Sequence, residues 1–425
     1  MKKMPRALAI ALLLACALAP LAARAQAPRM DRVRVGTRDL WVSGGNMAWV
    51  RFAHDFGPGP IRIDEYRQAF RELHAAGGNT MRVWVHTNGQ LSPEFRGDSV
   101  IGPGETTIDD LRAVLDAARQ EHVRVMLCLW SFDMLRAETG PAVTDRNVAL
   151  LGDTARLRAY VDHALVPMVT ALRGHPAILA WEVFNEPEGM TDEFGWPFNR
   201  HVPIAQVQLF INRVAGTIHR ADPEARVTNG SWSFRAASDV TSGVDQLVPG
   251  TPAARLSPAK LDSIRAAFAA RYRVPVTPQL ARAMYDTLRA WRPNVNYYRD
   301  DRLIAAGGDP RGTLDFYTVH YYAWGLPLLS PFHHDASFWR LDKPLVIAEF
   351  YLDDDTYGAG WRDLFPTLHA RGYAGALGWQ WFDAWTHRPS LTHNWPRTLA
   401  SARAIAAAHP AEVRVDDTAS TAPAP

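Results

Sequence analysis

Two glutamates occupy positions where an acidic side chain is costly. Glu186 follows the strand-like run Trp181–Asn185, and Glu349 comes near the end of the apolar run Leu345–Phe350. A carboxylate that closes a buried strand needs a partner or a chemical task, because an uncompensated buried charge is strongly destabilising. A buried salt bridge would explain either residue alone. Two carboxylates at one site are what glycoside hydrolysis requires: one protonates the leaving oxygen, and the other attacks the sugar or activates water.

Two neighbouring groups could divide these roles between the glutamates. Arg82, in another predicted strand, could hold Glu349 ionised, and Tyr322 could donate a hydrogen bond to the same carboxylate. Both contacts lower the pKa of a carboxyl group. Glu186 is flanked by aromatic and apolar residues, which would raise its pKa and keep it protonated as the acid.

Tryptophan is abundant, with 15 residues beside 12 Tyr and 17 Phe. Flat apolar rings suit the faces of sugars, although most tryptophans in any protein belong to the core. Trp379 and Trp381 lie in or next to the last predicted strand and could form a floor beneath a sugar. We expect one of the two to fill the barrel instead.

A scaffold must bring these distant side chains to one edge. Short β-rich runs alternate with amphipathic segments, and eight of the runs predict strands, at 40–44, 80–86, 124–130, 178–184, 226–229, 316–320, 345–350 and 374–379. Periodicity predicts helices at 63–76, 108–121, 154–173 and 205–221, with Asp64, Asp109 and Thr154 as caps. The alternation indicates an α/β protein with a parallel sheet, and eight repeats favour a closed (β/α)8 TIM barrel. An open doubly wound sheet would need a glycine-rich phosphate turn, which Gly44-Gly45-Asn46 does not match.

Residues 240–293 interrupt this rhythm between the fifth and sixth strands. They predict a helical insertion with helices near 258–272 and 278–291, each starting at a proline. A loop after a barrel strand emerges on the face that carries active sites. The insertion could therefore border the site, or it could be a surface decoration. If it borders the site, the side chains best able to touch a glycan are Arg255, Tyr272, Trp291 and Tyr297.

The first 25 residues predict a signal peptide. Basic residues precede an apolar run over 7–23, and Ala23-Arg24-Ala25 matches a small-x-small cleavage signal after Ala25. We expect a secreted or periplasmic protein, with a lipoprotein attached through Cys16 as the alternative. The catalytic domain is predicted at 30–412, followed by a disordered tail at 413–425. Without the leader Cys128 is the one remaining cysteine, and its apolar run predicts a buried, inert thiol.

Composition limits the partners. A hydrophobic fraction of 47% excludes disorder for most of the chain, and a net charge of +2 argues against nucleic acid or an anionic membrane as a partner. No cysteines cluster with metal-ligand spacing, and His333-His334 is more typical of a solvated loop. We therefore expect no metal and no cofactor, and we expect a monomer.

Several motifs together resemble glycoside hydrolase family 5, of clan A. They are Trp-x-x-x-Asn-Glu-Pro at 181–187, His-x-Tyr at 320–322 and the glutamate of Ile-Ala-Glu-Phe at 347–350. Blocks 43–49, 82–86, 181–189 and 312–317 look like the endo-β-1,4-mannanases of molluscs and other invertebrates. The resemblance spans roughly residues 35–400, apart from the insertion. It implies a (β/α)8 barrel that cleaves β-mannan or a related polysaccharide.

The resemblance also implies roles for individual residues. Glu186 would be the acid/base and Glu349 the nucleophile of a retaining double displacement. Asn185 would contact the 2-hydroxyl of the sugar at the point of cleavage, and His320 and Tyr322 would line the same subsite.

Two further residues bear on the substrate. Arg82 would orient the nucleophile, and His86 could face the substrate or be a structural histidine. Many family 5 cellulases carry a histidine after the third strand, whereas this chain has Trp130-Ser131-Phe132-Asp133, which puts a cellulase in doubt.

Other functions use the same two carboxylates. A β-mannosidase, a β-1,4-glucanase or a transglycosylase stays open, because mannose and glucose differ in the orientation of one hydroxyl. Endo and exo action also stay open. A carbohydrate-binding protein without catalysis is disfavoured because every catalytic position is filled. A phosphate-binding barrel or a metallohydrolase would need glycines or metal ligands that the pattern lacks.

Overall fold

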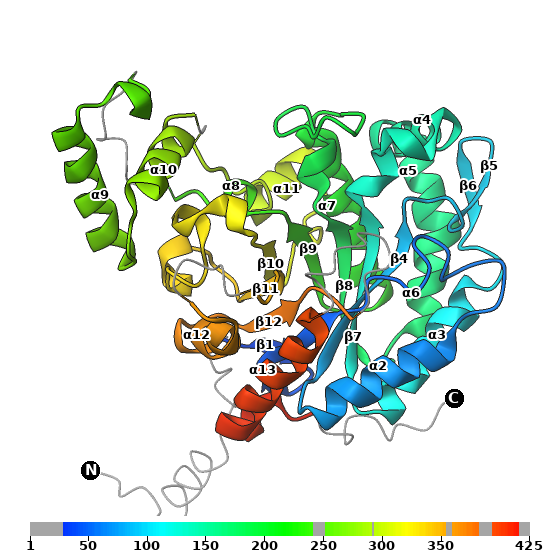
Figure 1. The fold of residues 1–425 in the computed structure, drawn as a ribbon. Helices are drawn as coiled ribbons and strands as arrows, with labels where there is room; N and C mark the ends of the chain where they lie inside the picture. Colours follow the sequence, from blue (N-terminus) through cyan, green and yellow to red (C-terminus); the bar gives the residue numbers. More distant parts are fainter. Residues whose placement is uncertain (1–28, 241–250, 291–292, 354–358, 382–392, 416–425) are drawn as a thin grey trace, which may run out of the picture.

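The computed structural model describes residues 29–240, 251–290, 293–353, 359–381 and 393–415. Its centre is a closed barrel of eight parallel strands (Figure 1). In order around the barrel these are β3 (Val42–Asn46), β4 (Thr80–Thr87), β7 (Arg124–Ser131), β8 (Ile178–Asn185), β9 (Val227–Ser231), β10 (Tyr317–His320), β11 (Leu345–Glu349) and β12 (Gly375–Gly378). The predicted barrel is confirmed, and each predicted strand ends within two residues of the observed one.

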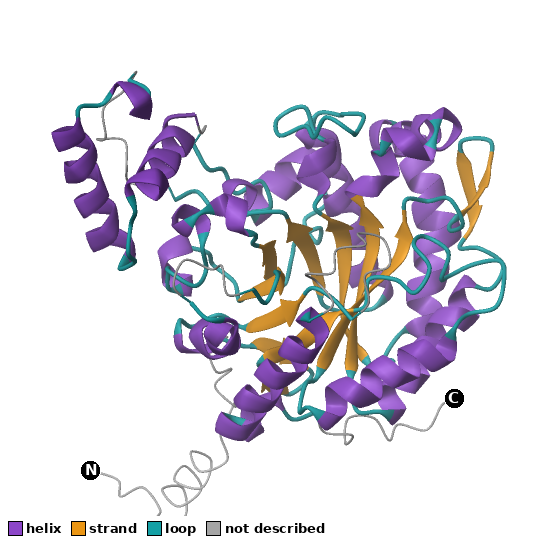
Figure 2. Ribbon diagram, in the orientation of Figure 1, coloured by secondary structure: helices purple, strands orange, loops and turns teal. Residues whose placement is uncertain are grey.

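Helices surround the strands, as Figure 2 shows in purple around orange. They include α2 (Ile63–Ala75), α3 (Thr107–Gln120), α4 (Pro141–Gly152), α7 (Ile204–Ala221), α11 (Asp300–Gly307), α12 (Leu364–Ala370) and α13 (Asn394–Ala408). The largest hydrophobic cluster joins the inner faces of these helices to the outer faces of the strands. Among the described residues, no helix has the length and apolar character needed to span a membrane.

The single helix predicted at 154–173 is wrong in detail. The structure has α5 (Thr154–Tyr160), a π-helical turn (Val161–Leu165) and α6 (Val166–Leu172). Pro167 lies just after the turn, and a proline inside a regular helix clashes with the carbonyl four residues earlier. A wider turn relieves that clash.

The predicted helix caps are also wrong. Asp153 caps α5, because its Oδ1 accepts a hydrogen bond from the backbone nitrogen of Ala155 at 2.7 Å. Asp64 and Asp109 lie inside the first turns of their helices instead of capping them. Acidic residues there still interact favourably with the helix dipole.

The insertion follows β9 and a short helix, α8 (Phe234–Ala237). Its helices α9 (Pro258–Tyr272) and α10 (Pro278–Ala290) start at the predicted prolines. They stand to one side of the barrel (Figure 1). They share a hydrophobic cluster of their own, to which Leu328, from the segment after β10, also belongs.

Of the insertion side chains predicted to meet a glycan, Tyr272 is buried in this cluster, with its ring edge-on to His334 at 5.4 Å. Arg255 is exposed and Tyr297 packs against the main core. Trp291 lies outside the described residues.

The two ends of the described chain meet beside the start of the barrel. β1 (Val33–Val35) and β2 (Arg38–Leu40) form a hairpin. The hairpin packs against alternate residues of the barrel strands. The short helix α14 (Pro410–Val413) joins it there, since the backbone nitrogen of Trp41 donates to the Glu412 carbonyl at 2.8 Å. The predicted signal peptide and residues 416–425 lie outside the described residues.

Candidate active site

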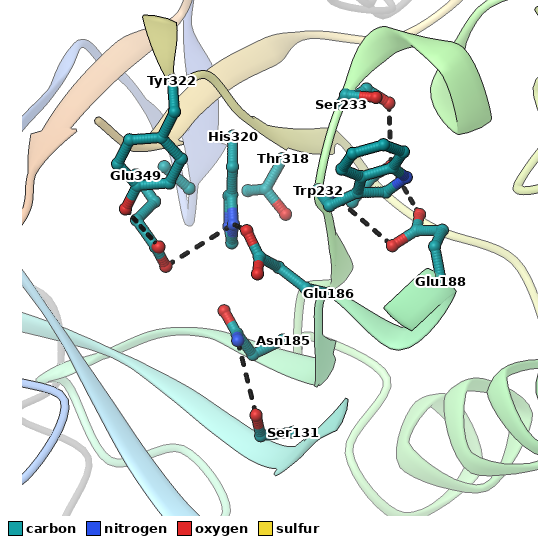
Figure 3. A network of polar contacts seen from close by, with 12 residues as sticks. Ser131, Asn185, Glu186, Glu188, Trp232, Ser233, Thr318, His320, Tyr322 and Glu349 are labelled. Carbon is teal, nitrogen blue, oxygen red and sulfur yellow. Dashed lines mark hydrogen bonds and ion pairs between the residues drawn. The ribbon is translucent and has the colours of Figure 1, made fainter. Parts of the chain in front are cut away.

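The two glutamates singled out in the sequence lie together at the carboxyl ends of β8 and β11. Figure 3 shows Glu186, His320 and Glu349 pointing toward one another. One oxygen of each carboxylate and a ring nitrogen of His320 all lie within 4.8 Å of one another. Glu186 is 8% exposed and Glu349 is 5% exposed, so both are largely shielded from solvent.

Arg82, on β4, is the centre of the network beneath them. It is fully buried, and its Nη1 donates to Glu349 Oε2 at 3.2 Å and to Asn46 Oδ1 at 3.0 Å. Its Nη2 donates to Asn185 Oδ1 at 2.8 Å. The rigid fork of a guanidinium fixes several acceptors at once. Arg82 therefore orients both the carboxylate of Glu349 and the amide of Asn185.

Glu182, which the sequence analysis did not assign, balances the charge of Arg82. Its Oε2 accepts from Arg82 Nε at 2.5 Å, and its Oε1 accepts from Thr318 Oγ1 at 3.1 Å. Both side chains are inaccessible to solvent. The signal was present in the sequence, because a glutamate inside a buried strand needs a buried cation.

Glu349 is surrounded by groups that stabilise its ionised form. Besides the contact with Arg82, Tyr322 donates its hydroxyl to Glu349 Oε1 at 2.5 Å, and His320 Nδ1 lies 3.5 Å from Oε2. Burial raises the pKa of Glu349, and the three groups work against that effect. Arg82 and Tyr322 thus act in the predicted direction, but burial outweighs them, because the depth of a site cannot be read from the sequence.

Glu186 has fewer such contacts. Burial raises its pKa to about 8, with Arg82 opposing the shift. Its one side-chain hydrogen bond among the described residues is to His320 Nδ1, at 2.9 Å. A carboxyl group in this setting holds its proton at neutral pH. Glu186 therefore has fewer groups that stabilise an ionised carboxylate than Glu349 has.

The backbone of Glu186 is left-handed, with φ 47° and ψ 50°. A non-glycine residue in this conformation costs about 1–3 kcal/mol and persists only where its surroundings hold it. Its nitrogen donates to the Gly230 carbonyl at 2.7 Å. A Cβ on Gly230 would lie 2.7 Å from Glu182 Oε1 and 3.0 Å from the Phe184 carbonyl, so only glycine lets β9 come this close.

His320 lies between the two carboxylates. It is fully buried, and burial lowers its pKa to about 4, so the ring is neutral at neutral pH. With its proton on Nδ1, the ring can donate to either carboxylate.

The two tryptophans just after β12 have different surroundings. Trp379 is in ring contact with Trp49 at 5.7 Å and with Trp84 at 5.9 Å, and Arg82 lies 5.6 Å from the Trp84 ring. Trp381 packs against the main hydrophobic core instead. Trp379 is therefore the ring beside the polar network.

His86 does not join this network. It is buried, with Nδ1 2.9 Å from Ser92 Oγ, and its ring contacts Trp130 at 4.9 Å and Tyr160 at 5.7 Å. Burial lowers its pKa to about 3. The structural alternative for this residue fits these contacts, because they hold it between strand and helix.

Comparisons with known proteins show the family of this chain. A mannan endo-1,4-beta-mannosidase of Mytilus edulis is 30% identical over 376 residues, which cover 82% of this chain and 86% of that protein. The chain belongs to the mannan endo-1,4-β-mannosidase family. It is therefore a glycoside hydrolase. A family member from Cryptopygus antarcticus is 30% identical over 373 residues, covering 81% of each chain. No protein-family model matches.

Solved structures of the family share the fold. The β-mannanase of the blue mussel superposes with a TM-score of 0.67 at 27% identity, covering 89% of this chain and 94% of its own. The endo-1,4-β-mannanase of Eisenia fetida gives 0.67 at 30% identity, covering 88% and 92%.

In this family member, an aromatic pair on the loops after β9 and β10 escaped the sequence analysis. Trp232, just after β9, stacks on Trp324, which follows β10, at 4.4 Å and 15° between planes. Trp324 is 42% exposed, so it presents its other face to solvent. Trp324 comes two residues after Tyr322, which binds Glu349. Both tryptophans follow predicted strands closely, which was the one sequence signal for a place near the site. Their stacking was not predictable, because it depends on two loops that only the fold brings together.

Two sets of side chains within the described residues could offer three ligand atoms to a metal, namely Glu186 with His320 and Glu349, and His369 with His409 and Glu412. In each set an arginine already binds a carboxylate, Arg82 on Glu349 and Arg32 on Glu412. A guanidinium in contact with the same carboxylate competes with a metal cation. The absence of a metal and of a cofactor stays a prediction.

Proposed function

We propose that this chain is a retaining endo-β-1,4-mannanase, with Glu186 as acid/base and Glu349 as nucleophile. The observation that carries the proposal is the approach of the two carboxylates to within 4.8 Å between oxygens. Retaining glycosidases hold their carboxyl groups about 5–5.5 Å apart, whereas inverting ones leave about 6.5–9.5 Å for a water. Carboxylate oxygens within 4.8 Å of each other are compatible with the retaining spacing, which supports direct attack by Glu349.

In the first step Glu349 attacks the anomeric carbon and forms a covalent glycosyl ester, while Glu186 gives its proton to the leaving oxygen. In the second step Glu186 takes a proton from water, the water attacks the same carbon, and Glu349 leaves as carboxylate. The negative charge thus moves from Glu349 to Glu186 and back. His320 Nδ1 lies near both, so its N–H can stabilise whichever carboxylate is charged.

The surrounding residues would position the sugar. Asn185, held by Arg82, would bind the 2-hydroxyl, and Tyr322 would line the same subsite while binding Glu349. Trp379 would form the floor. Trp324, backed by Trp232, offers a flat apolar face for a further sugar. These residues support action on a polymer.

The mannan substrate rests on the names of the relatives, which are mannan endo-1,4-beta-mannosidases. Internal cleavage agrees with the insertion standing beside the barrel and not over its strands (Figure 1). Secretion is proposed from the sequence of the first 25 residues.

A panel of β-mannan, glucomannan, carboxymethylcellulose and aryl β-mannosides tests this proposal. We expect reducing sugar from mannan with a rapid fall in viscosity, and NMR of the first product should show the β-anomer. Release of mannose alone would indicate a β-mannosidase, and preference for carboxymethylcellulose a glucanase. An initial α-anomer would refute the retaining mechanism.

A further inference from the structure

One more glutamate, Glu188, lies two residues after Glu186 and is completely buried. Its Oε1 accepts hydrogen bonds from Ser231 Oγ and from the Tyr298 hydroxyl, each at 2.6 Å. Its Oε2 accepts from the backbone nitrogen of Trp232 at 3.2 Å (Figure 3). All three donors belong to other segments, so this one carboxyl group joins the end of β8 to the end of β9 and to the chain that returns from the insertion.

Glu188 is unusual because no ion pair with a basic residue accompanies it in the described part of the chain. Burial raises its pKa to about 7, and its three donors oppose that shift. A buried acid without a counter-ion is a poor source of stability, since apolar residues of similar volume usually do as well. An apolar residue could not replace the three directional hydrogen bonds that Glu188 accepts.

These contacts surround the strained backbone of Glu186. The nitrogen of Glu186 donates to Gly230, and the next two residues of β9 and its loop, Ser231 and Trp232, donate to Glu188. The left-handed turn at Glu186 is therefore fastened to β9 on both sides. Without the second attachment, the turn could relax toward an ordinary conformation and carry the Glu186 carboxyl away from His320.

Tyr298 connects this turn to the insertion. It lies in the segment between α10 and α11, where its nitrogen donates to Asn296 Oδ1 at 3.0 Å. The nitrogen of Asn296 in turn donates to Asp239 Oδ1 at 3.0 Å, just after α8. The entry and the exit of the insertion are thus held together, and the Tyr298 hydroxyl extends from that junction to Glu188.

We propose that Glu188 is a positioning residue, which with Tyr298 holds the turn that carries Glu186 and so ties the place of the general acid to the base of the insertion. This inference rests on the proposed function, in which Glu186 protonates the leaving oxygen. Glu188 touches neither the sugar nor the reacting atoms. Its effect is to keep the Glu186 carboxyl where a proton can pass to the substrate.

The test uses two substrates that differ in their need for a proton. Mannotetraose has a poor leaving group that must be protonated, whereas dinitrophenyl β-mannobioside has one that leaves unaided. Glu188→Ala should lower kcat/KM for mannotetraose about 100-fold, because a displacement of about 1 Å can cost that much. The aryl substrate should lose less than about fivefold, since the general acid contributes little there.

Glu188→Gln should restore most of the activity. Its amide oxygen can accept from Trp232, and its NH2 can donate to Ser231, whose own proton turns to the Ser233 carbonyl at 3.1 Å. Tyr298→Phe should show a smaller loss with the same dependence on leaving group. Tyr285→Phe, which removes a hydrogen bond to the Thr251 carbonyl inside the insertion, is the matched control and should show none.

Equal losses on both substrates for Glu188→Ala would overturn the proposal, because a merely structural role lowers both together with the melting temperature. So would unchanged kinetics. If Glu188→Ala does not fold, Tyr298→Phe and Tyr285→Phe are compared on the two substrates. A greater loss on mannotetraose than on the aryl substrate for Tyr298→Phe alone supports the proposal, and its absence overturns the proposal. Glu186→Ala is measured beside them. If its activity loss does not depend on the leaving group, the proposed function itself fails. If the loss depends on the leaving group in Glu186→Ala but not in the Glu188 and Tyr298 variants, only the positioning role is refuted.

Discussion

Replacing Tyr322 by Phe removes a single oxygen from the site. That oxygen donates the 2.5 Å hydrogen bond to Glu349 Oε1, and nothing else about the ring need change. A hydrogen bond to an ionised group contributes about 1.5–3 kcal/mol. About 1.4 kcal/mol corresponds to one pKa unit. Because the bond stabilises the ionised carboxylate, its loss should raise the pKa of Glu349 by about one to two units.

The sign of the kinetic effect follows from the role of each carboxyl group. Glu349 must be ionised to attack, so activity is lost as pH falls through its pKa. In the variant, the acidic limb of the pH–rate profile should therefore move upward by about one to two pH units. Glu186 must be protonated, so activity is lost as pH rises through about 8. The alkaline limb should stay in place, because Tyr322 donates to Glu349.

The assay is the pH dependence of kcat/KM for mannotetraose, whose leaving group must be protonated, compared between wild type and variant. Tyr321→Phe is the matched control, since it removes a neighbouring hydroxyl that donates to the Leu326 carbonyl at 3.1 Å. A uniform fall in rate with an unmoved acidic limb would refute the reasoning about the pKa of Glu349. A downward movement would refute it as well.

Four other outcomes are expected. Glu349→Ala should abolish turnover of every substrate, whereas Glu186→Ala should lose about 10²–10⁴-fold on mannooligosaccharides and far less on activated aryl glycosides, which steady-state kinetics will show. Arg82→Met should lower the free energy of unfolding by about 3–5 kcal/mol, measured in denaturant, because Glu182 and Glu349 lose their buried cation; a change below about 1 kcal/mol would contradict that. Cys128 should resist thiol reagents in the native enzyme, since it is buried and burial raises its pKa; rapid labelling would contradict this.

The barrel was predictable because its strands are short apolar runs separated by amphipathic helices, a pattern that residue types alone specify. The position of Glu349 was readable for a related reason, since a charge at the end of a buried strand needs an explanation. The stacking of Trp232 on Trp324 was not readable, because it depends on how two loops cross. The π-helical turn before Pro167 was missed because periodicity over the whole segment concealed a local clash.

The direction of the pKa shift of Glu349 could not be predicted from the sequence for another reason. Whether Arg82 and Tyr322 or desolvation prevails depends on how deeply the carboxylate lies, and depth is a property of the folded site.

The meeting of the chain ends has a consequence for how the barrel can be encoded. β12 pairs with β3 over four residues, from Gly375 with Val42 to Gly378 with Gly45, as regularly as strands that are neighbours in the sequence. The ring thus has no physical first strand. A circularly permuted gene, with a short linker joining the segment after α14 to the one before β1, should encode the same enzyme. New ends at the exposed turn Gly97–Asp98, between β5 (Glu94–Arg96) and β6 (Ser99–Gly102), would leave all eight barrel strands intact.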